Sequence, residues 1–229
     1  VADLYWSAAI NISMILVAFL SPVLGAASDY YSSKKKYLMF FTFLSITATG
    51  MLYFVTEGKI MLGIILFIFA NIGFQAGLGF YDAFIKEISE PRNYNKVSSL
   101  GYAVGYLGSL ASLAAVIILQ DSPRLTFLAC AIMFLIFSLP MFFFVKEKKK
   151  VVTDSVRPNF LTIGLRRTAE TLRHINQYRN LKLFLFSYFL YIDGVNTIIF
   201  FSANYAQTTL NFEIPDLILF FVIVQVTAL

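Results

Sequence analysis

The sequence predicts an all-α integral membrane protein, a bundle of about seven transmembrane helices. Hydrophobic residues make up 59% of the 229 positions, charged residues only 14%, and the mean hydropathy is +0.74. A soluble domain of this length needs far more charge to cover its surface. Seven apolar segments reach or approach the roughly 20 residues that cross a bilayer as a helix. Uninterrupted runs of this length favour helices over the short alternating strands of a membrane barrel.

The apolar segments follow one another along the whole chain. The first five lack charged residues, and the sixth contains a single charge, Asp193. Pro215 and Asp216 suit the start of the seventh helix, where a missing N–H is harmless and a carboxylate meets the helix dipole favourably. The predicted spans are 4–28, 37–56, 60–81, 97–120, 125–145, about 183–201, and 214 to the last residue.

Charge sets the expected orientation. Sixteen of the 18 Lys and Arg residues fall in the loops on one side, and only Lys59 and Arg124 lie opposite. The positive-inside rule therefore places the sixteen in the cytoplasm. The first span would then begin outside, which a further span before Val1 would explain. With Leu229 inside an apolar run, we expect the chain to be a piece of a larger protein.

A basic linker, residues 146–182, separates five spans in residues 1–145 from two in residues 183–229. Within it Leu161, Leu165, Leu172 and Ile175 recur at helical spacing, with arginines around the rest of the helix. This pattern predicts an amphipathic helix, either at the cytoplasmic membrane surface or as a solvated connector.

Three stretches resemble one transporter family. Gly25-Ala-Ala-Ser-Asp29 followed by Lys34, Lys35 and Lys36 resembles the loop signature between the second and third helices of the major facilitator superfamily. The stretches 81–108 and 189–199 resemble a narrower subfamily, which contains fungal vacuolar amino-acid effluxers of the autophagy pathway and bacterial relatives.

The resemblance implies a fold of twelve helices in two halves, of which this chain would supply helices two to eight. It also implies secondary transport of a small solute, with amino acids as the leading candidate, by rocking of the two halves. Tyr30 and Ser32 stand where the superfamily loop usually carries a basic residue and a glycine. The gating contacts of that loop are therefore less firmly implied in this chain.

The resemblance of the loop signature predicts a cytoplasmic gate. Asp29 would hold the two halves together through ion pairs and helix-end dipoles, unless it only neutralises nearby lysines. Tyr81 and Asp82 end the third span and serve either this gate or the helix cap. The predicted gate residues are Gly25, Asp29, Lys34, Lys35, Tyr81 and Asp82.

Polar residues inside the spans predict a substrate or proton path. Asp193 lies well inside the sixth segment, where a charge is costly and normally faces a cavity. It is expected to carry a proton, bind a substrate ammonium or form a structural ion pair. Amides at these depths either line such a path or hydrogen-bond between helices. The predicted path residues are Asp193, Asn196, Asn71, Gln75 and Asn11.

Gly101, Gly105 and Gly108 step along the fourth span by four and three residues, so we expect close helix packing there. The alternative is an exchanger-type hinge.

Several functions are excluded or disfavoured. The sequence has no phosphate-binding glycine loop, no paired Cys or His ligands and no serine–histidine arrangement. We therefore expect no enzyme, no cofactor or metal, and no nucleic-acid binding.

The expected partners are membrane lipids, a small solute and protons, in a protein that works as a single chain. A bacterial inner membrane is the preferred location, with a vacuolar membrane as the alternative. A non-transporting scaffold or receptor with this fold stays open.

Overall fold

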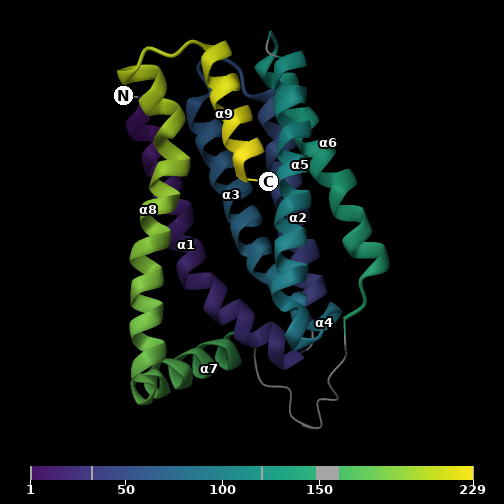
Figure 1. Ribbon diagram of the computed structural model, residues 1–229, viewed down its shortest axis with the longest axis vertical. Helices are drawn as coiled ribbons and strands as arrows, with labels where there is room; N and C mark the ends of the chain where they lie inside the picture. Colours follow the sequence, from purple (N-terminus) through teal and green to yellow (C-terminus); the bar gives the residue numbers. More distant parts are fainter. Residues whose placement is uncertain (1, 32, 120, 148–159, 229) are drawn as a thin grey trace.

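The computed structural model describes residues 2–31, 33–119, 121–147 and 160–228, and every element in these ranges is a helix (Figure 1). The predicted linker 146–182 thus falls partly outside the described residues, at positions 148–159. In chain order the elements are α1 (Ala2–Tyr31), α2 (Lys34–Met51), η1 (Leu52–Phe54), α3 (Ile60–Ala83), α4 (Ile85–Ile88), η2 (Pro91–Asn93), α5 (Tyr94–Ile118), α6 (Pro123–Phe144), α7 (Phe160–His174), η3 (Ile175–Gln177), α8 (Arg179–Thr209) and α9 (Ile214–Ala228).

The predicted membrane helices are confirmed. Among the described residues, six helices are long and apolar enough to cross a membrane, and α9 is a shorter apolar helix. The sixth is longer than predicted, since α8 extends past 183–201 at both ends and continues without a break through Gly194. Arg179 and Lys182 at its start are compatible with a membrane helix, because long cationic side chains reach back to the polar surface.

The most extensive helix contact in the described structure joins α2 to α3. A Cβ built on Gly73 would lie 2.7 Å from Phe41 O and 2.7 Å from Ser45 N, both backbone atoms of α2. One turn further, a Cβ on Gly77 would lie in ordinary contact with Phe41. Beside this crossing, apolar side chains from both helices form the core cluster of Leu38, Phe41, Ile72, Ala76, Phe80 and Phe84. Small residues let two backbones approach closely, and this contact is driven by van der Waals packing.

A second contact joins α1 to α3. Asn71 Nδ2 on α3 donates a 2.6 Å hydrogen bond to Ser13 Oγ on α1, and Ser13 Oγ donates to Ile10 O at 2.8 Å. Ser13 is fully buried. Pro22 lies inside α1, and its missing N–H and ring allow a bend, so that the lower part of α1 slants towards α4 in Figure 1.

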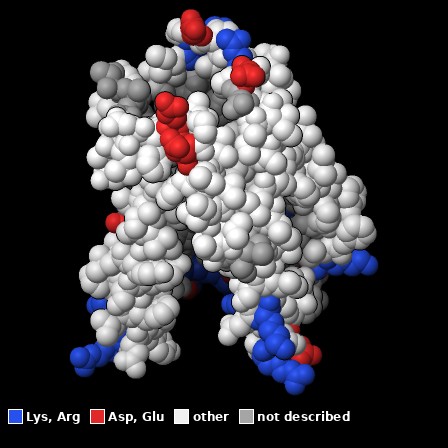
Figure 2. All heavy atoms as spheres, turned by 45° about the horizontal axis from the view of Figure 1, so that its top comes forward, with Lys and Arg blue, Asp and Glu red and all other residues white. Residues whose placement is uncertain are grey.

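Charges collect at the two ends of the bundle. Figure 2 shows acidic side chains mainly at the upper end and most of the visible Lys and Arg side chains at the lower end. The wide zone between them is almost free of charge on the face shown, as expected of a surface in contact with lipid. The chain is therefore an integral, multi-pass membrane protein.

Candidate functional site

The start of α2 concentrates positive charge, which carboxylates of neighbouring elements compensate. The helix begins with Lys34, Lys35 and Lys36, and its first turn contains no acidic residue. Cations are unfavourable at a helix N-terminus, where unpaired N–H groups already concentrate positive charge. Ser33 occupies the N-cap position but makes no capping hydrogen bond through its side chain. Carboxylates from three other parts of the chain supply the compensating negative charge, and one of them also caps the helix.

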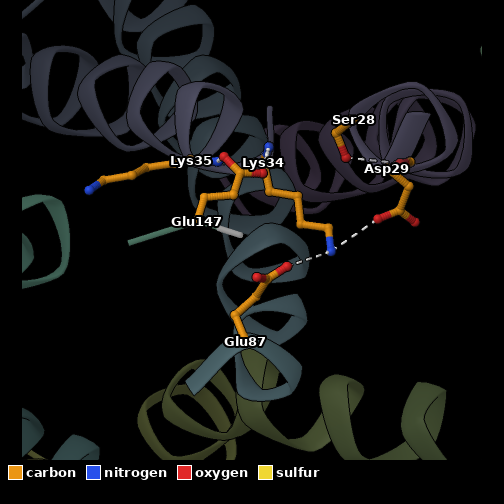
Figure 3. Close-up of polar contacts among 7 residues, drawn as sticks. Ser28, Asp29, Lys34, Lys35, Glu87 and Glu147 are labelled. Atoms are coloured by element: carbon orange, nitrogen blue, oxygen red, sulfur yellow. Dashed lines mark hydrogen bonds and ion pairs between the residues drawn. The ribbon is translucent and has the colours of Figure 1, made fainter. Parts of the chain in front are cut away.

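Two of these carboxylates bind the Lys34 ammonium group (Figure 3). Lys34 Nζ lies 3.1 Å from Asp29 Oδ1, near the end of α1, and 3.3 Å from Glu87 Oε1 on α4. The side chains of Lys34 and Glu87 are only 14% and 12% exposed, whereas that of Asp29 is 55% exposed. The Lys34–Glu87 pair is therefore shielded from water, and half of the Asp29 side chain remains available to another partner.

The third carboxylate caps α2 from the far end of α6. Glu147 Oε1 accepts a 2.7 Å hydrogen bond from Lys34 N, and Glu147 Oε2 accepts one of 3.2 Å from Lys35 N. In the same place Lys35 Nζ donates a 2.5 Å hydrogen bond to Val145 O. Figure 3 shows the Lys34 and Lys35 side chains pointing to opposite sides of the helix start. A carboxylate on free N–H groups satisfies the orphan donors and the helix dipole together.

We call Asp29, Lys34, Lys35, Glu87 and Glu147 the hinge cluster. It contains three of the predicted gate residues and joins α1, α2, α4 and the segment after α6. A fourth predicted residue, Gly25, accepts a hydrogen bond from Ser28 Oγ at 2.9 Å. Among the described residues, no atom lies within 4 Å of a Cβ built on Gly25, so this glycine leaves open space beside α1.

The other predicted gate residues, Tyr81 and Asp82, are exposed at the end of α3, and no described contact joins them to the hinge cluster. Glu87 and Glu147 take that place, and sequence reasoning missed both. Glu87 lies inside the motif that begins at Tyr81, and Glu147 interrupts a run of lysines. An acid within a basic run was the available signal for Glu147.

The predicted path residues lie on three different helices. Asn71 is engaged with Ser13 between α3 and α1, which is the helix-bridging alternative. Gln75 follows one turn later and is partly buried, whereas Asn11 is exposed with a 3.5 Å hydrogen bond to Ser7 Oγ. Asp193 and Asn196 lie on α8, where Asp193 is exposed and Asn196 is partly buried. A role for these five residues in transport stays a prediction.

A wide apolar cavity of about 1030 Å³ lies among α2, α3, α5, α6 and α9, and none of the predicted path residues lines it. Gly101, Gly105 and Gly108 form part of its wall. Among the described residues, nothing lies within 4 Å of a Cβ built on any of these three glycines. Close packing at these three glycines stays a prediction, whereas the described structure has a close helix contact at Gly73. Gly73 and Gly77 are four residues apart, as are Gly101 and Gly105, but only the α3 pair has atoms of another helix within 4 Å of its built Cβ positions among the described residues.

Comparison with known proteins identifies the family. The family model described as "Vacuole effluxer Atg22 like" matches residues 5–93 and 86–229. The uncharacterised MFS-type transporter YxiO of Bacillus subtilis (strain 168) is 32% identical over 237 residues, which cover 98% of this chain and 54% of that protein. The chain thus spans about half the length of the curated relative that it matches. No solved structure matches it significantly. With its apolar helices and loop signature, the chain belongs to the vacuole effluxer Atg22-like family of the major facilitator superfamily.

Proposed function

We propose that the protein containing this chain is a secondary transporter that moves a small solute, amino acids first among the candidates, by alternating access. The observation that carries the gating part is the hinge cluster, in which one ammonium group binds two carboxylates between α1 and α4. The substrate class rests on the description of the family as vacuole effluxers and stays a proposal for this chain.

In this proposal the hinge cluster prepares Asp29 for a second partner. Lys34, which is shielded and also bound by Glu87, fixes one side of the Asp29 carboxylate, while about half of the Asp29 side chain is exposed. The described ion pairs and hydrogen bonds of the cluster lie within residues 29–147, which belong to the predicted first half and the start of the linker. A helix terminus or cation of the second half would bind the exposed side when the cytoplasmic end closes.

We further propose that Asp193 takes part in coupling. It is the only charge within the central part of α8, residues 183–201, where an ionisable side chain is costly unless it faces protein or water. A carboxylate there can exchange a proton during transport or bind a substrate ammonium group. The protein is proposed to work as a single chain in a bacterial inner membrane, with a vacuolar membrane as the alternative.

The test uses the full-length protein in liposomes loaded with a mixture of amino acids. Efflux is followed with and without an imposed pH gradient, for the wild type and for Asp193→Asn. Asp216→Asn is the matched control, because Asp216 caps the start of α9 through Glu213 N at 3.0 Å and lies away from the middle of a span. Gradient-dependent efflux that only Asp193→Asn abolishes supports the proposal. No efflux of any amino acid from liposomes with folded protein overturns the substrate class and favours a scaffold or receptor.

A further inference from the structure

We propose that the linker between the predicted halves holds the turn between α1 and α2, which we call the hinge, through two contacts, which we call grips. In this proposal Glu147 and Arg167 are positioning residues of the gate. One end of the linker, at Glu147, holds the start of α2, and the other end, α7, holds the end of α1. The inference rests on the proposed gating function and adds the part of the chain that regulates it.

The first grip consists of hydrogen bonds to the start of α2. The Glu147 carboxylate accepts both Lys34 N and Lys35 N, and Lys35 Nζ donates back to Val145 O. Glu147 and Lys34 are 113 positions apart in sequence. A cap supplied from so far away links the position of the linker to the integrity of the first turn of α2, because the orphan N–H groups have no other described acceptor.

The second grip is the contact of α7 with α1. A Cβ built on Gly164 would lie 2.5 Å from Val23 O and 2.6 Å from Val23 Cγ1, so only a glycine fits at this crossing. The neighbouring Ile163 is buried. Near the end of α1, the Arg167 guanidinium carbon lies 4.9 Å from the centre of the Tyr30 ring, within the range of a cation–π contact. α7 is thus docked on protein, and of its predicted leucine face Leu165 is exposed.

The two grips act on the two helices that meet at the hinge. Tyr30 lies one residue after Asp29, and Lys34 begins the next helix, so the linker contacts the neighbour of one member of the Asp29–Lys34 ion pair and the other member itself. Beyond α7 the chain passes through η3 directly into α8, the first helix of the predicted second half. A movement of α8 would therefore pull on Tyr30 through α7. The linker in this way makes closure of the gate depend on the position of the second half.

The test measures access to the hinge from its lysine-rich side, and it needs no substrate. Ser28, which is almost completely buried beside Asp29, is replaced by cysteine in full-length protein whose other cysteines, Cys130 included, are removed. Reaction with a membrane-impermeant maleimide is timed in inside-out vesicles. Glu147→Gln and Arg167→Ala are compared with Glu90→Gln and Arg166→Ala. The control Glu90 side chain is 75% exposed, and the control Arg166 side chain is 78% exposed.

Glu147→Gln is expected to raise the labelling rate about tenfold, since a charge-assisted hydrogen bond typically shifts an equilibrium by that factor or more. Arg167→Ala is expected to raise it about threefold, in keeping with an exposed cation–π contact. The exposed controls stay within about twofold of the starting protein. Glu147→Asp and Arg167→Lys, which keep the charge, give rates between those of the starting protein and the disruptive variants.

A second reporter separates opening of the hinge from loss of the fold. Ser13→Cys lies in the middle of α1 at a fully buried position, and unfolding would expose it. The cysteine of Ser13→Cys should stay unreactive in all variants. If Glu147→Gln or Arg167→Ala makes it reactive, the Ser28→Cys labelling rate in the charge-keeping variant, Glu147→Asp or Arg167→Lys, is used instead to decide. Unchanged labelling of Ser28→Cys in Glu147→Gln and Arg167→Ala, or an equal rise in the controls, overturns the inference. Because labelling needs no transport, the linker grip can stand even if the protein moves no amino acid.

Discussion

At the scale of single residues, Lys34 is the centre of the site because its ammonium group compensates two carboxylates while its backbone N–H binds a third. The aspartate and lysine of this arrangement could be predicted from the loop signature, since they lie close together in sequence. Glu87 and Glu147 could not, because they reach Lys34 from 53 and 113 positions away. Only the packing of α4 and the end of α6 brings them there.

The two partners of the Lys34 ammonium group should differ in their effect on stability. Glu87→Gln is expected to lower the free energy of unfolding by about 1–3 kcal/mol, because it removes a charge from a shielded ion pair. Asp29→Asn is expected to cost no more than about 1 kcal/mol, because the Asp29 side chain is 55% exposed and its pair is screened by water. Thermal unfolding of purified protein in detergent measures both. Equal losses for the two variants would contradict the difference in burial.

Asn71 gives a second prediction at this scale. Asn71→Leu is expected to destabilise the protein by about 0.5–1.5 kcal/mol, the range found for hydrogen bonds between membrane helices. It removes the 2.6 Å bond to Ser13, whereas the control Asn11→Leu removes only an exposed bond of 3.5 Å to Ser7. Unfolding in detergent reports the loss. A variant of normal stability that transports poorly would instead place Asn71 in the substrate path.

At the scale of helices, the apolar runs predicted each membrane helix, but the contacts between helices were harder to infer. Glycines at a spacing of four occur on both α3 and α5, at Gly73 and Gly77 and at Gly101 and Gly105. Only the α3 pair meets another helix in the described structure. Sequence spacing places glycines on one face of a helix, whereas tertiary packing decides which face is covered. For the same reason, Leu165 is exposed on α7 although it lies on the predicted leucine face.

Two glycines of α3 test this packing. Gly73→Ala is expected to lower the free energy of unfolding by about 1–3 kcal/mol, because the added methyl overpacks the crossing. The methyl would lie 2.7 Å from two backbone atoms of α2, which a flexible side chain could not relieve. Gly79→Ala, on the same helix, meets nothing within 4 Å among the described residues and should be neutral or slightly stabilising. The midpoint of thermal unfolding distinguishes the two; a neutral Gly73→Ala would mean that α2 and α3 are further apart.

At the scale of the whole molecule, fold class and family were predictable because the signals are strong and local. Long uncharged segments define membrane helices, and two subfamily stretches and one loop signature define the family. The path residues lacked such a signal: an amide or carboxylate inside a span serves transport or structure depending on what faces it. The division of the chain into halves, and its orientation, stay predictions from the linker and the positive-inside rule.

The central claim is that the hinge cluster gates a transporter, and exchange of labelled amino acids across liposomes containing the full-length protein tests it most directly. The wild type, Lys34→Met and the control Lys36→Met are compared, because Lys36 is exposed whereas the Lys34 side chain is shielded and binds two carboxylates. We predict exchange by the wild type and by Lys36→Met, and a loss of about tenfold in Lys34→Met, as expected when a closed state loses roughly 1.4 kcal/mol of stabilisation. Wild-type exchange by Lys34→Met, or no exchange by the wild type, would contradict the claim.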